Sequence, residues 1–243
     1  MKALNTYINE KLVLNKTTFK SPYNYFPKTK KELQKIIKKL LEERKDNDVI
    51  DLNDIDTSKI TEMNELFEDA DIKDIDISKW NMSKVTDVSS MFYNCHNLKS
   101  VGNLNKWDVS EVNNMDYMFY KCENLIYIGD ISDWDISKVK SFVDMFYLCK
   151  NLELIGDISS WNINIHEKTA MIGMFNGCNN LRFIGDLSHW DVSSVKYLHY
   201  MFYNCKKLKS VGDLSRWNIS NVEDMEDMFT NSAITNIPSW YKK

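Results

Sequence analysis

Glycine and proline are scarce in this chain, and long apolar runs are missing from its sequence. Seven Gly and three Pro among 243 residues argue against a disordered or collagen-like chain. No stretch reaches 18 apolar residues, so the sequence predicts no membrane insertion. The opening MKALNTYINEKLVLNK has a polar residue every few positions and no apolar h-region, so we expect neither a signal peptide nor a membrane anchor. These features favour a cytoplasmic or virion-associated protein over a classically secreted one.

The cysteines and histidines do not form a reactive or metal-binding pattern. The five Cys are odd in number and lie one repeat apart, unlike a disulfide framework or a zinc site with C-x₂-C pairs. The four His lie outside any nucleophile elbow, His-Glu-x-x-His motif or phosphate loop; they are His96, His166, His189 and His199. We therefore expect no cofactor, no metal and no enzymatic activity.

The net charge of −4 conceals two parts of opposite charge. Residues 1–50 carry 12 Lys and Arg against six Asp and Glu, or +6, and the remainder carries 19 against 29, or −10. Binding to nucleic acid requires clustered Lys and Arg that neutralise phosphates. The acidic part is therefore predicted not to bind nucleic acid.

What the chain has in abundance is a repeat. The stretch MFYNCHNLKSVGNLNKW at 91–107 returns every 27 residues, apart from two extra residues within 163–171. All Cys and all Trp fall at fixed phases of this repeat, namely Cys95, Cys122, Cys149, Cys178 and Cys205, and Trp80, Trp107, Trp134, Trp161, Trp190, Trp217 and Trp240. Such a period is typical of a solenoid, in which each coil buries its apolar side against its neighbours.

Each coil divides into two parts with different apolar spacing. Val88, Met91, Phe92 and Cys95 are three or four residues apart, which predicts a helical segment. The following stretch, 98–107, has few helix formers and predicts a short strand that pairs in parallel with the same strand of the next coil. Stacked strands lie about 4.8 Å apart, whereas packed helices need about 8–10 Å. We therefore expect a curved array with the strands on its concave side.

The sequence divides into three parts. Residues 1–49 are predicted as a helical N-terminal cap or attachment segment, with one amphipathic helix at 4–12. A second helix follows the T-x-x-E capping box, and its residues are Thr29 and Glu32, then Leu33, Ile36, Ile37, Leu40 and Leu41. Residues 50–232 are predicted as a solenoid of about seven coils. Residues 233–243 are predicted as a closing strand, in which Pro238 blocks further pairing.

The coils at 51–237 resemble the leucine-rich repeats of the BspA-like bacterial surface protein family. The matching phrases are DIDISKWNMSKVTDVSSMFYNCHNL at 74–98, WDVSEVNNMDYMFYKCENL at 107–125 and RWNISNVEDMEDMF at 216–229. Trp stands here at the family's Phe position, and an extra Gly-centred residue appears from Val101 onward. The resemblance implies an α/β solenoid, which is a curved leucine-rich-repeat array, with surface display and binding of proteins or host components.

The opening residues carry a second resemblance. The phrase LNTYINEKLVLNK is similar to a leader shared by assorted proteins of gut anaerobic bacteria and their phages. That similarity implies a virion component or an intracellular protein.

Two rows of residues on the strand side form the candidate binding site. If Val101 and its equivalents point inward, the preceding residues point outward on the concave face, and three of them are apolar: Tyr127, Leu154 and Phe183. Beside them, acidic residues recur one coil apart: Asp130, Asp157, Asp186 and Asp213. An apolar strip rimmed by polar groups is typical of an interaction site. The alternative is that the three side chains tuck under their neighbours.

The acidic row also admits a metal interpretation. Calcium-binding solenoids use a Gly-Gly-x-Gly-x-Asp pattern, which this chain lacks. We therefore interpret these Asp side chains as acceptors for backbone donors or as exposed groups.

A second candidate surface follows the Met-Phe pair of each coil. It is a row of tyrosines with others nearby, namely Tyr93, Tyr120, Tyr147 and Tyr203 with Tyr117, Tyr197 and Tyr200. Such a row is more typical of half-buried packing than of a binding patch.

Together these patterns predict a non-enzymatic, monomeric binding protein that holds a protein or glycan partner on its concave face. Exposed edge strands leave stacked dimers open. The alternative function is structural, as a spacer or virion component attached through residues 1–49.

Overall fold

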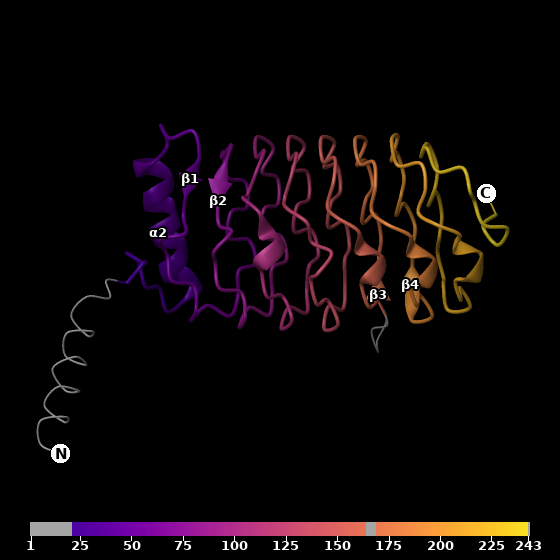
Figure 1. The fold of residues 1–243 in the computed structure, drawn as a ribbon, viewed down its shortest axis with the longest axis horizontal. Coiled ribbons are helices and arrows are strands. Elements are labelled where there is room, and N and C mark those ends of the chain that lie inside the picture. Colours follow the sequence, from indigo (N-terminus) through magenta and orange to yellow (C-terminus); the bar gives the residue numbers. More distant parts are fainter. Residues whose placement is uncertain (1–20, 164–168, 243) are drawn as a thin grey trace, which may run out of the picture.

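The computed structural model describes residues 21–163 and 169–242 and shows an elongated stack of coils with α2 at one end (Figure 1). The regular elements are α2 (Lys30–Glu43), β1 (Ile50–Asp51), β2 (Ile75–Asp76), η1 (Leu104–Lys106), η2 (Ile158–Ser160), β3 (Thr169–Ala170), η3 (Leu187–His189), β4 (Val195–Tyr197) and η4 (Leu214–Arg216), where η is a 3₁₀ helix. Most of each coil consists of turns and extended segments. The helix predicted at 4–12 lies outside the described residues. No helix within the described ranges is long and apolar enough to cross a membrane.

α2 begins at the predicted capping box. The Thr29 side chain accepts the Glu32 N–H at 3.2 Å, and the Glu32 carboxylate accepts the N–H of Lys28 at 2.7 Å. The apolar stripe of the helix is buried in the core that it shares with the coils, through Leu33, Ile37 and Leu40. α2 therefore covers apolar surface that the first coil would otherwise expose.

One side of the stack is a parallel ladder that joins the predicted strand of each coil to the next. We call it the front ladder, and its single bridges link in order Asp74, Ser100, Tyr127, Leu154 and Phe183. At the N-terminal end the same ladder widens into the parallel pair β1 and β2. The predicted parallel pairing is therefore present, mostly with one residue pair per coil.

The helical segment predicted in each coil is wrong. Two residues of this segment lie in the left-handed region, for example Ser90 (φ 53°) and Asn94 (φ 59°), and an α-helix does not accommodate them. The backbone bonds to the neighbouring coil instead, as where the Phe92 N–H donates to the Met118 C=O at 2.9 Å. Successive turns along the inside of the coil produce the apolar spacing that suggests a helix.

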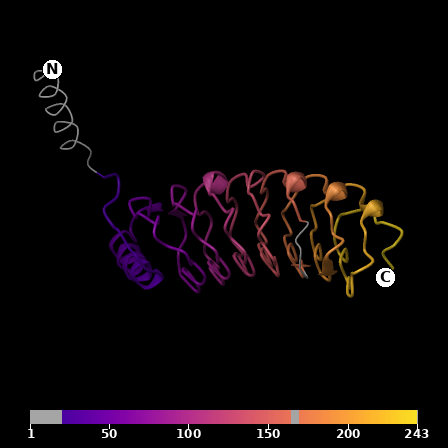
Figure 2. The same ribbon diagram turned by 90° about the horizontal axis from the view of Figure 1, so that it is seen from below.

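These segments form a second parallel ladder, the back ladder. It contains the β3–β4 pair and bridges that link Glu62 to Asp87, Asp87 to Asn114, Ser141 to Ala170, and Tyr197 to Asp224. Figure 2 shows the 3₁₀ helices and β4 on opposite sides of the body. Backbone hydrogen bonds therefore join neighbouring coils on both sides.

The curvature predicted from a strand–helix mismatch is also wrong. With ladders on both sides, no helix imposes a wider spacing on either. Equivalent rings one coil apart are 4.7 Å apart for Tyr93 and Tyr120, and 6.4 Å apart for Trp107 and Trp134. The body is therefore bowed only slightly, and the 3₁₀ helices lie on its outer side (Figure 2). The front ladder belongs to a nearly flat face and not to a concave one.

The recurrent Trp and Cys residues each bond to the preceding coil. Every Trp indole N–H donates to a backbone C=O of that coil at 2.9–3.1 Å, which confirms the predicted indole hydrogen bond. Every Cys is buried, and its thiol donates to the C=O of the preceding coil's Phe at 2.9–3.1 Å. The sequence interpretation of Cys as a small hydrophobe missed this second hydrogen bond.

The C-terminal segment closes the array without forming the predicted strand. Residues 233–242 are turns and irregular structure. Trp240 stacks on Trp217 at 6.4 Å, and Ile234 is buried against the last coil. Because Pro238 lacks an N–H, this segment covers the core with side chains rather than with a backbone ladder.

Candidate binding face

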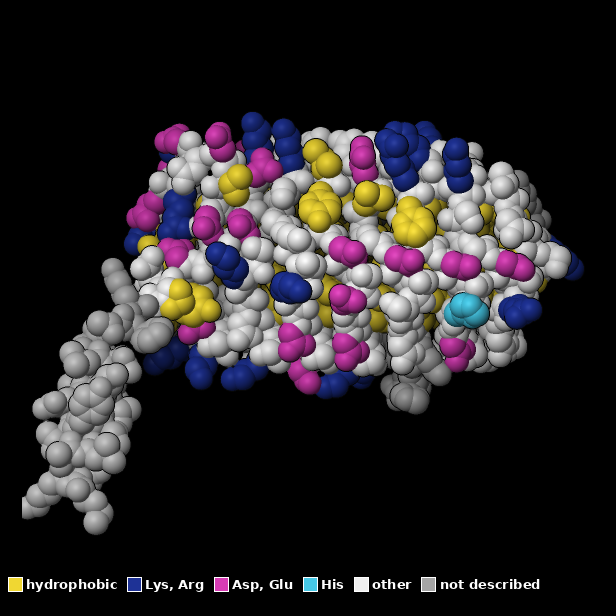
Figure 3. Space-filling model, in the orientation of Figure 1, with side chains coloured by type: hydrophobic (Ala, Val, Ile, Leu, Met, Phe, Trp, Pro, Cys, Tyr) yellow, Lys and Arg dark blue, Asp and Glu magenta, His cyan; other side chains and the backbone are white. Residues whose placement is uncertain are grey.

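An apolar strip lies on the front ladder in the middle of the array. It consists of Ile126, Tyr127, Leu154 and Phe183, whose side chains are 45–48% exposed. Figure 3 shows the strip as a cluster of hydrophobic side chains on one face of the body. The three predicted residues do not tuck under their neighbours. Ile126 was missed because its row carries charged residues in most other coils.

The backbone holds the strip in place. Ile128, Ile155 and Ile184 follow in the same segments and are fully buried. Because successive residues of an extended segment point to opposite sides, their burial directs the strip residues outward. The ladder bridges fix the strip further, so a partner would meet a surface that is already ordered.

An acidic ladder runs parallel to the strip. It consists of Asp130, Asp157, Asp186 and Asp213, all exposed, and Figure 3 shows a line of acidic side chains beside the hydrophobic cluster. In each, Oδ1 accepts the N–H of the serine two residues later at 2.9–3.0 Å. The interpretation of these residues as backbone acceptors is therefore confirmed.

The serine hydrogen bonds also keep the carboxylates charged. Backbone and side-chain hydrogen bonds from Ser188 hold the pKa of Asp186 below its usual range, and those from Ser215 do the same for the pKa of Asp213. The ladder therefore presents negative charge at neutral pH.

The ladder continues toward α2 through residues that sequence reasoning missed. The β1–β2 register aligns Asp51 with Asp76, and both accept an N–H two residues later, at 2.8 and 2.9 Å. Asn103 makes the same turn in the next coil at 3.1 Å. The extra Gly of the later coils shifts the count by one, which hid this alignment in the sequence.

The glycine before each ladder residue makes room for the ladder residue of the preceding coil. Gly156 has φ 95°, and a Cβ at this position would lie 1.9 Å from Asp130 Oδ1. The same contact recurs at Gly129, Gly185 and Gly212. The predicted positive φ is therefore confirmed, and the contact explains why Gly and Asp recur together.

The other flank of the strip carries both charges. Glu153 and Arg182 lie on neighbouring coils, with 4.0 Å between Oε1 and a guanidinium nitrogen, and both are about half exposed. Lys209 follows in the same row and is exposed. The strip is therefore bordered by acid on one side and by a mixture on the other.

The tyrosine row is a packed stack. Tyr93, Tyr120 and Tyr147 are half-buried, and their ring centroids are 4.7 Å apart from coil to coil. Asn176 interrupts the row before Tyr203. These contacts agree with the packing interpretation of this row.

Groups with reactive chemistry lie elsewhere. Burial raises the pKa of the Cys149 and Cys205 thiols far above the usual value. His199 lies with Nδ1 3.1 Å from Asp224 Oδ2, and His166 lies outside the described residues. In the part of the chain that the structure describes, no group of three or more His, Cys, Asp or Glu could hold a metal ion.

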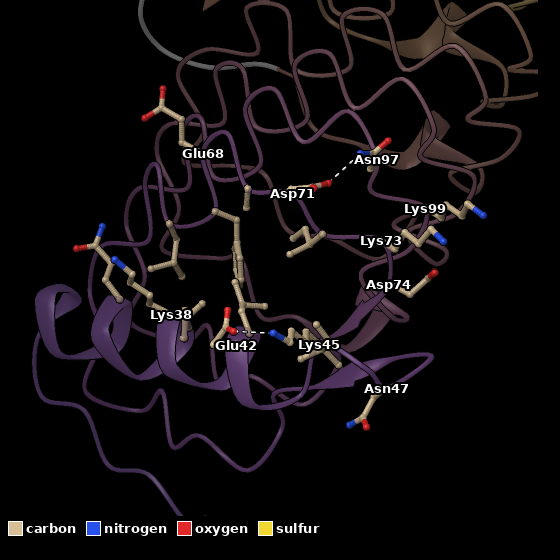
Figure 4. Close-up of a pocket in the computed structure, with 18 of the residues that line it drawn as sticks. Lys38, Glu42, Lys45, Asn47, Glu68, Asp71, Lys73, Asp74, Asn97 and Lys99 are labelled. Carbon is tan, nitrogen blue, oxygen red and sulfur yellow. Dashed lines mark hydrogen bonds and ion pairs between the residues drawn. The ribbon is translucent and has the colours of Figure 1, made fainter.

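A groove of about 1280 Å³ separates α2 from the first coils (Figure 4). Its apolar lining includes Ile37, Leu41 and Phe67. Its rim carries charges of both signs, some of them already paired, as Glu42 is with Lys45 at 2.8 Å. The groove therefore does not favour a ligand of one charge.

Comparison with known proteins supports the repeat interpretation. A family model described as "Mycoplasma protein of unknown function, DUF285" matches the chain twice, at residues 35–153 and 125–240. This double match confirms the repeat-family resemblance drawn from the sequence.

One solved structure is similar to this chain. It is a leucine-rich repeat protein from Eubacterium ventriosum, with 17% sequence identity and a TM-score of 0.36. The similarity covers 79% of this chain and 38% of that protein, so the chain spans well under half of that protein's length. No curated protein matches the chain.

Proposed function

This chain belongs to the repeat family described as "Mycoplasma protein of unknown function, DUF285", and we propose that it is a non-enzymatic binding protein whose partner is another protein. The partner would rest on the apolar strip and be bordered by the acidic ladder. The observation that carries this proposal is the exposure of four large apolar side chains, each 45–48% exposed, in one cluster of an otherwise well-buried array. Soluble proteins rarely expose such clusters outside interaction sites.

The composition of the face supports a protein partner. Aromatic residues such as Tyr127 and Phe183 supply large contact areas at low entropic cost, and polar groups around them exclude water. The surrounding carboxylates add directional selectivity. A glycan partner is an outcome that the test below separates.

The chemistry of the described residues supports binding in preference to catalysis. The thiols, which are the strongest nucleophiles of the chain, are buried and protonated. The ladder carboxylates hold turns through hydrogen bonds to backbone N–H groups. Catalytic acids and bases need accessible groups poised near the working pH.

A structural function is the second candidate, and the cap favours it. α2 exposes a row of lysines on the face opposite its buried stripe, namely Lys31, Lys35, Lys38 and Lys39. The segment is firmly attached to the array, because Arg44 bonds to Asp54 at 2.8 Å and Tyr25 bridges Ile55. In this alternative the lysine row contacts an assembly and the coils act as a spacer.

A pull-down from cell lysate and culture supernatant distinguishes the two functions. The baits are the intact chain, a strip variant (Tyr127→Ser with Phe183→Ser), a control variant (Phe26→Ser with Ile237→Ser) and a lysine variant (Lys31→Glu with Lys35→Glu). The control removes exposed apolar side chains away from the strip, where Phe26 is 56% and Ile237 38% exposed. All baits are checked for folding by circular dichroism.

The proposed function predicts that a protein partner is lost from the strip variant alone. Loss from the lysine variant alone would support the structural alternative. A glycan array run with the same baits identifies carbohydrate binding, and equal capture by all four baits would overturn both proposals.

A further inference from the structure

From the spacing and charge of this face we infer that the strip binds a basic amphipathic α-helix lying along the long axis of the array. The inference rests on the proposed function, because it names the occupant of the same face. Three properties of the surface carry it: the rise from coil to coil, the number of apolar steps, and the sign of charge on one flank.

The rise from coil to coil fits the pitch of an α-helix. Residues of the front ladder are joined by parallel bridges, which place equivalent backbone positions about 4.8 Å apart. Equivalent aromatic rings are between 4.7 Å and 6.4 Å apart from coil to coil. One turn of α-helix rises 5.4 Å, so a helix along the axis offers one turn to each coil. An extended strand repeats its side chains on one face every 6.6 Å or so and loses register within two coils.

The strip specifies how many turns make contact. Tyr127, Leu154 and Phe183 occupy three successive coils, and Ile126 widens the strip at the first of them. A partner helix that matches this row presents apolar residues at i, i+3 or i+4, and i+7. The contact therefore spans about two helical turns.

The acidic ladder specifies the charge beside the apolar stripe. Its carboxylates recur at the same step as the strip, one per coil, through Asp130, Asp157, Asp186 and Asp213. Lys or Arg residues spaced one turn apart along one edge of the partner helix would each meet one carboxylate. The opposite flank already pairs Glu153 with Arg182, so it does not favour the same sign. The array as a whole carries −10 outside residues 1–50, which attracts a basic segment over longer distances.

The test measures binding of labelled 18-residue peptides to the full chain by fluorescence anisotropy at low and at raised salt. The first peptide has apolar residues at i, i+4, i+7 and i+11, with Lys along one edge. The second has the same composition in scrambled order, and the third carries Glu in place of Lys. We expect the first peptide to bind at least tenfold more tightly than the other two, with an affinity that falls as salt rises.

Charge variants of the chain provide the second readout. Asp157→Asn with Asp186→Asn removes two charges and keeps the turn, because Asn103 makes the same turn natively. A matched control is Asp108→Asn with Asp135→Asn, which also hold serine turns in a different row, where Asn81 and Asn218 occur naturally. We expect the ladder variant to weaken binding of the first peptide about tenfold, and the control to change it less than twofold.

Equal binding of the three peptides, or equal effects of the two charge variants, would overturn the helix inference. The proposed function would survive that result if the strip variant still lost its partner in the pull-down. Binding of a glycan that Tyr127→Ser abolishes, without peptide binding, would also overturn the inference.

Discussion

The contact between Gly156 and Asp130 gives the sharpest test of how neighbouring coils fit together. Substitution Gly156→Ala places a Cβ 1.9 Å from Asp130 Oδ1, at a backbone φ of 95°. The left-handed backbone costs a residue with a side chain roughly 1–2 kcal/mol. Moving the carboxylate off the Ser132 N–H, which it accepts at 3.0 Å, costs about another 1 kcal/mol. We therefore expect Gly156→Ala to lower the free energy of unfolding by about 2–3 kcal/mol.

A double-mutant cycle separates the contact from the backbone strain. Asp130→Ala alone loses the Ser132 hydrogen bond, at a cost of about 1 kcal/mol. In the double variant that hydrogen bond is already gone and no carboxylate remains to be displaced, so only the cost of the positive φ adds to it. The double variant should therefore be more stable than the sum of the two single effects predicts, by about 1 kcal/mol. Asp130→Asn is the control, because Asn keeps the oxygen and should give no such relief.

Urea unfolding followed by Trp fluorescence measures these differences, with unchanged slopes required for the comparison. Additive effects, with a coupling below about 0.5 kcal/mol, would show that the Gly–Asp contact does not determine the fit between coils. Relief in the Asp130→Asn background equal to that in the Asp130→Ala background would refute the same reasoning.

Three further predictions concern the core and the back ladder. Burial together with the Asp116 carboxylate raises the pKa of Asp144 to about 6, so ionised Asp144 destabilises the folded state above that pH; after allowance for solvent screening, the wild type should gain about 1–2 kcal/mol relative to Asp144→Asn between pH 7 and pH 4, and parallel stability curves would contradict this. The five buried thiols should not react with a thiol reagent in the folded chain and should all react after denaturation, whereas fast native labelling would contradict their burial. Trp134→Phe leaves the Leu104 C=O without its indole donor and should lower the free energy of unfolding by about 1–3 kcal/mol in the urea assay, while a neutral effect would show that this hydrogen bond is dispensable.

The repeat was predictable from the sequence because period and packing express the same constraint. Residues at one phase stack on their equivalents one coil away, so the 27-residue step predicted the parallel front ladder and the indole hydrogen bonds. The start of α2 was predictable because its cap is local, with Thr29 and Glu32 only three residues apart. The exposure of Tyr127, Leu154 and Phe183 followed from alternation along an extended segment.

The helical part of the coil was not predictable from apolar spacing alone. A helix and a chain of turns both place apolar residues three or four positions apart, and the difference lies in two left-handed residues per coil. Many of these carry residue types that tolerate a positive φ, such as Asn94, Asn204, Asn231, Gly173 and Gly177. Others, such as Leu148 (φ 56°), do not reveal the conformation. The curvature was wrong for the same reason, since it depended on the helix.

The two ladders have a consequence for length. Because both sides of each coil rise by nearly the same amount, adding a coil would extend the body by about 5 Å and change its direction very little. A horseshoe that gains coils changes its radius and eventually wraps around itself. This body would instead behave as a gauge, in which the coil number sets the distance at which α2 and the C-terminal end are held. Family members that differ by whole coils would then measure out different distances while presenting the same face.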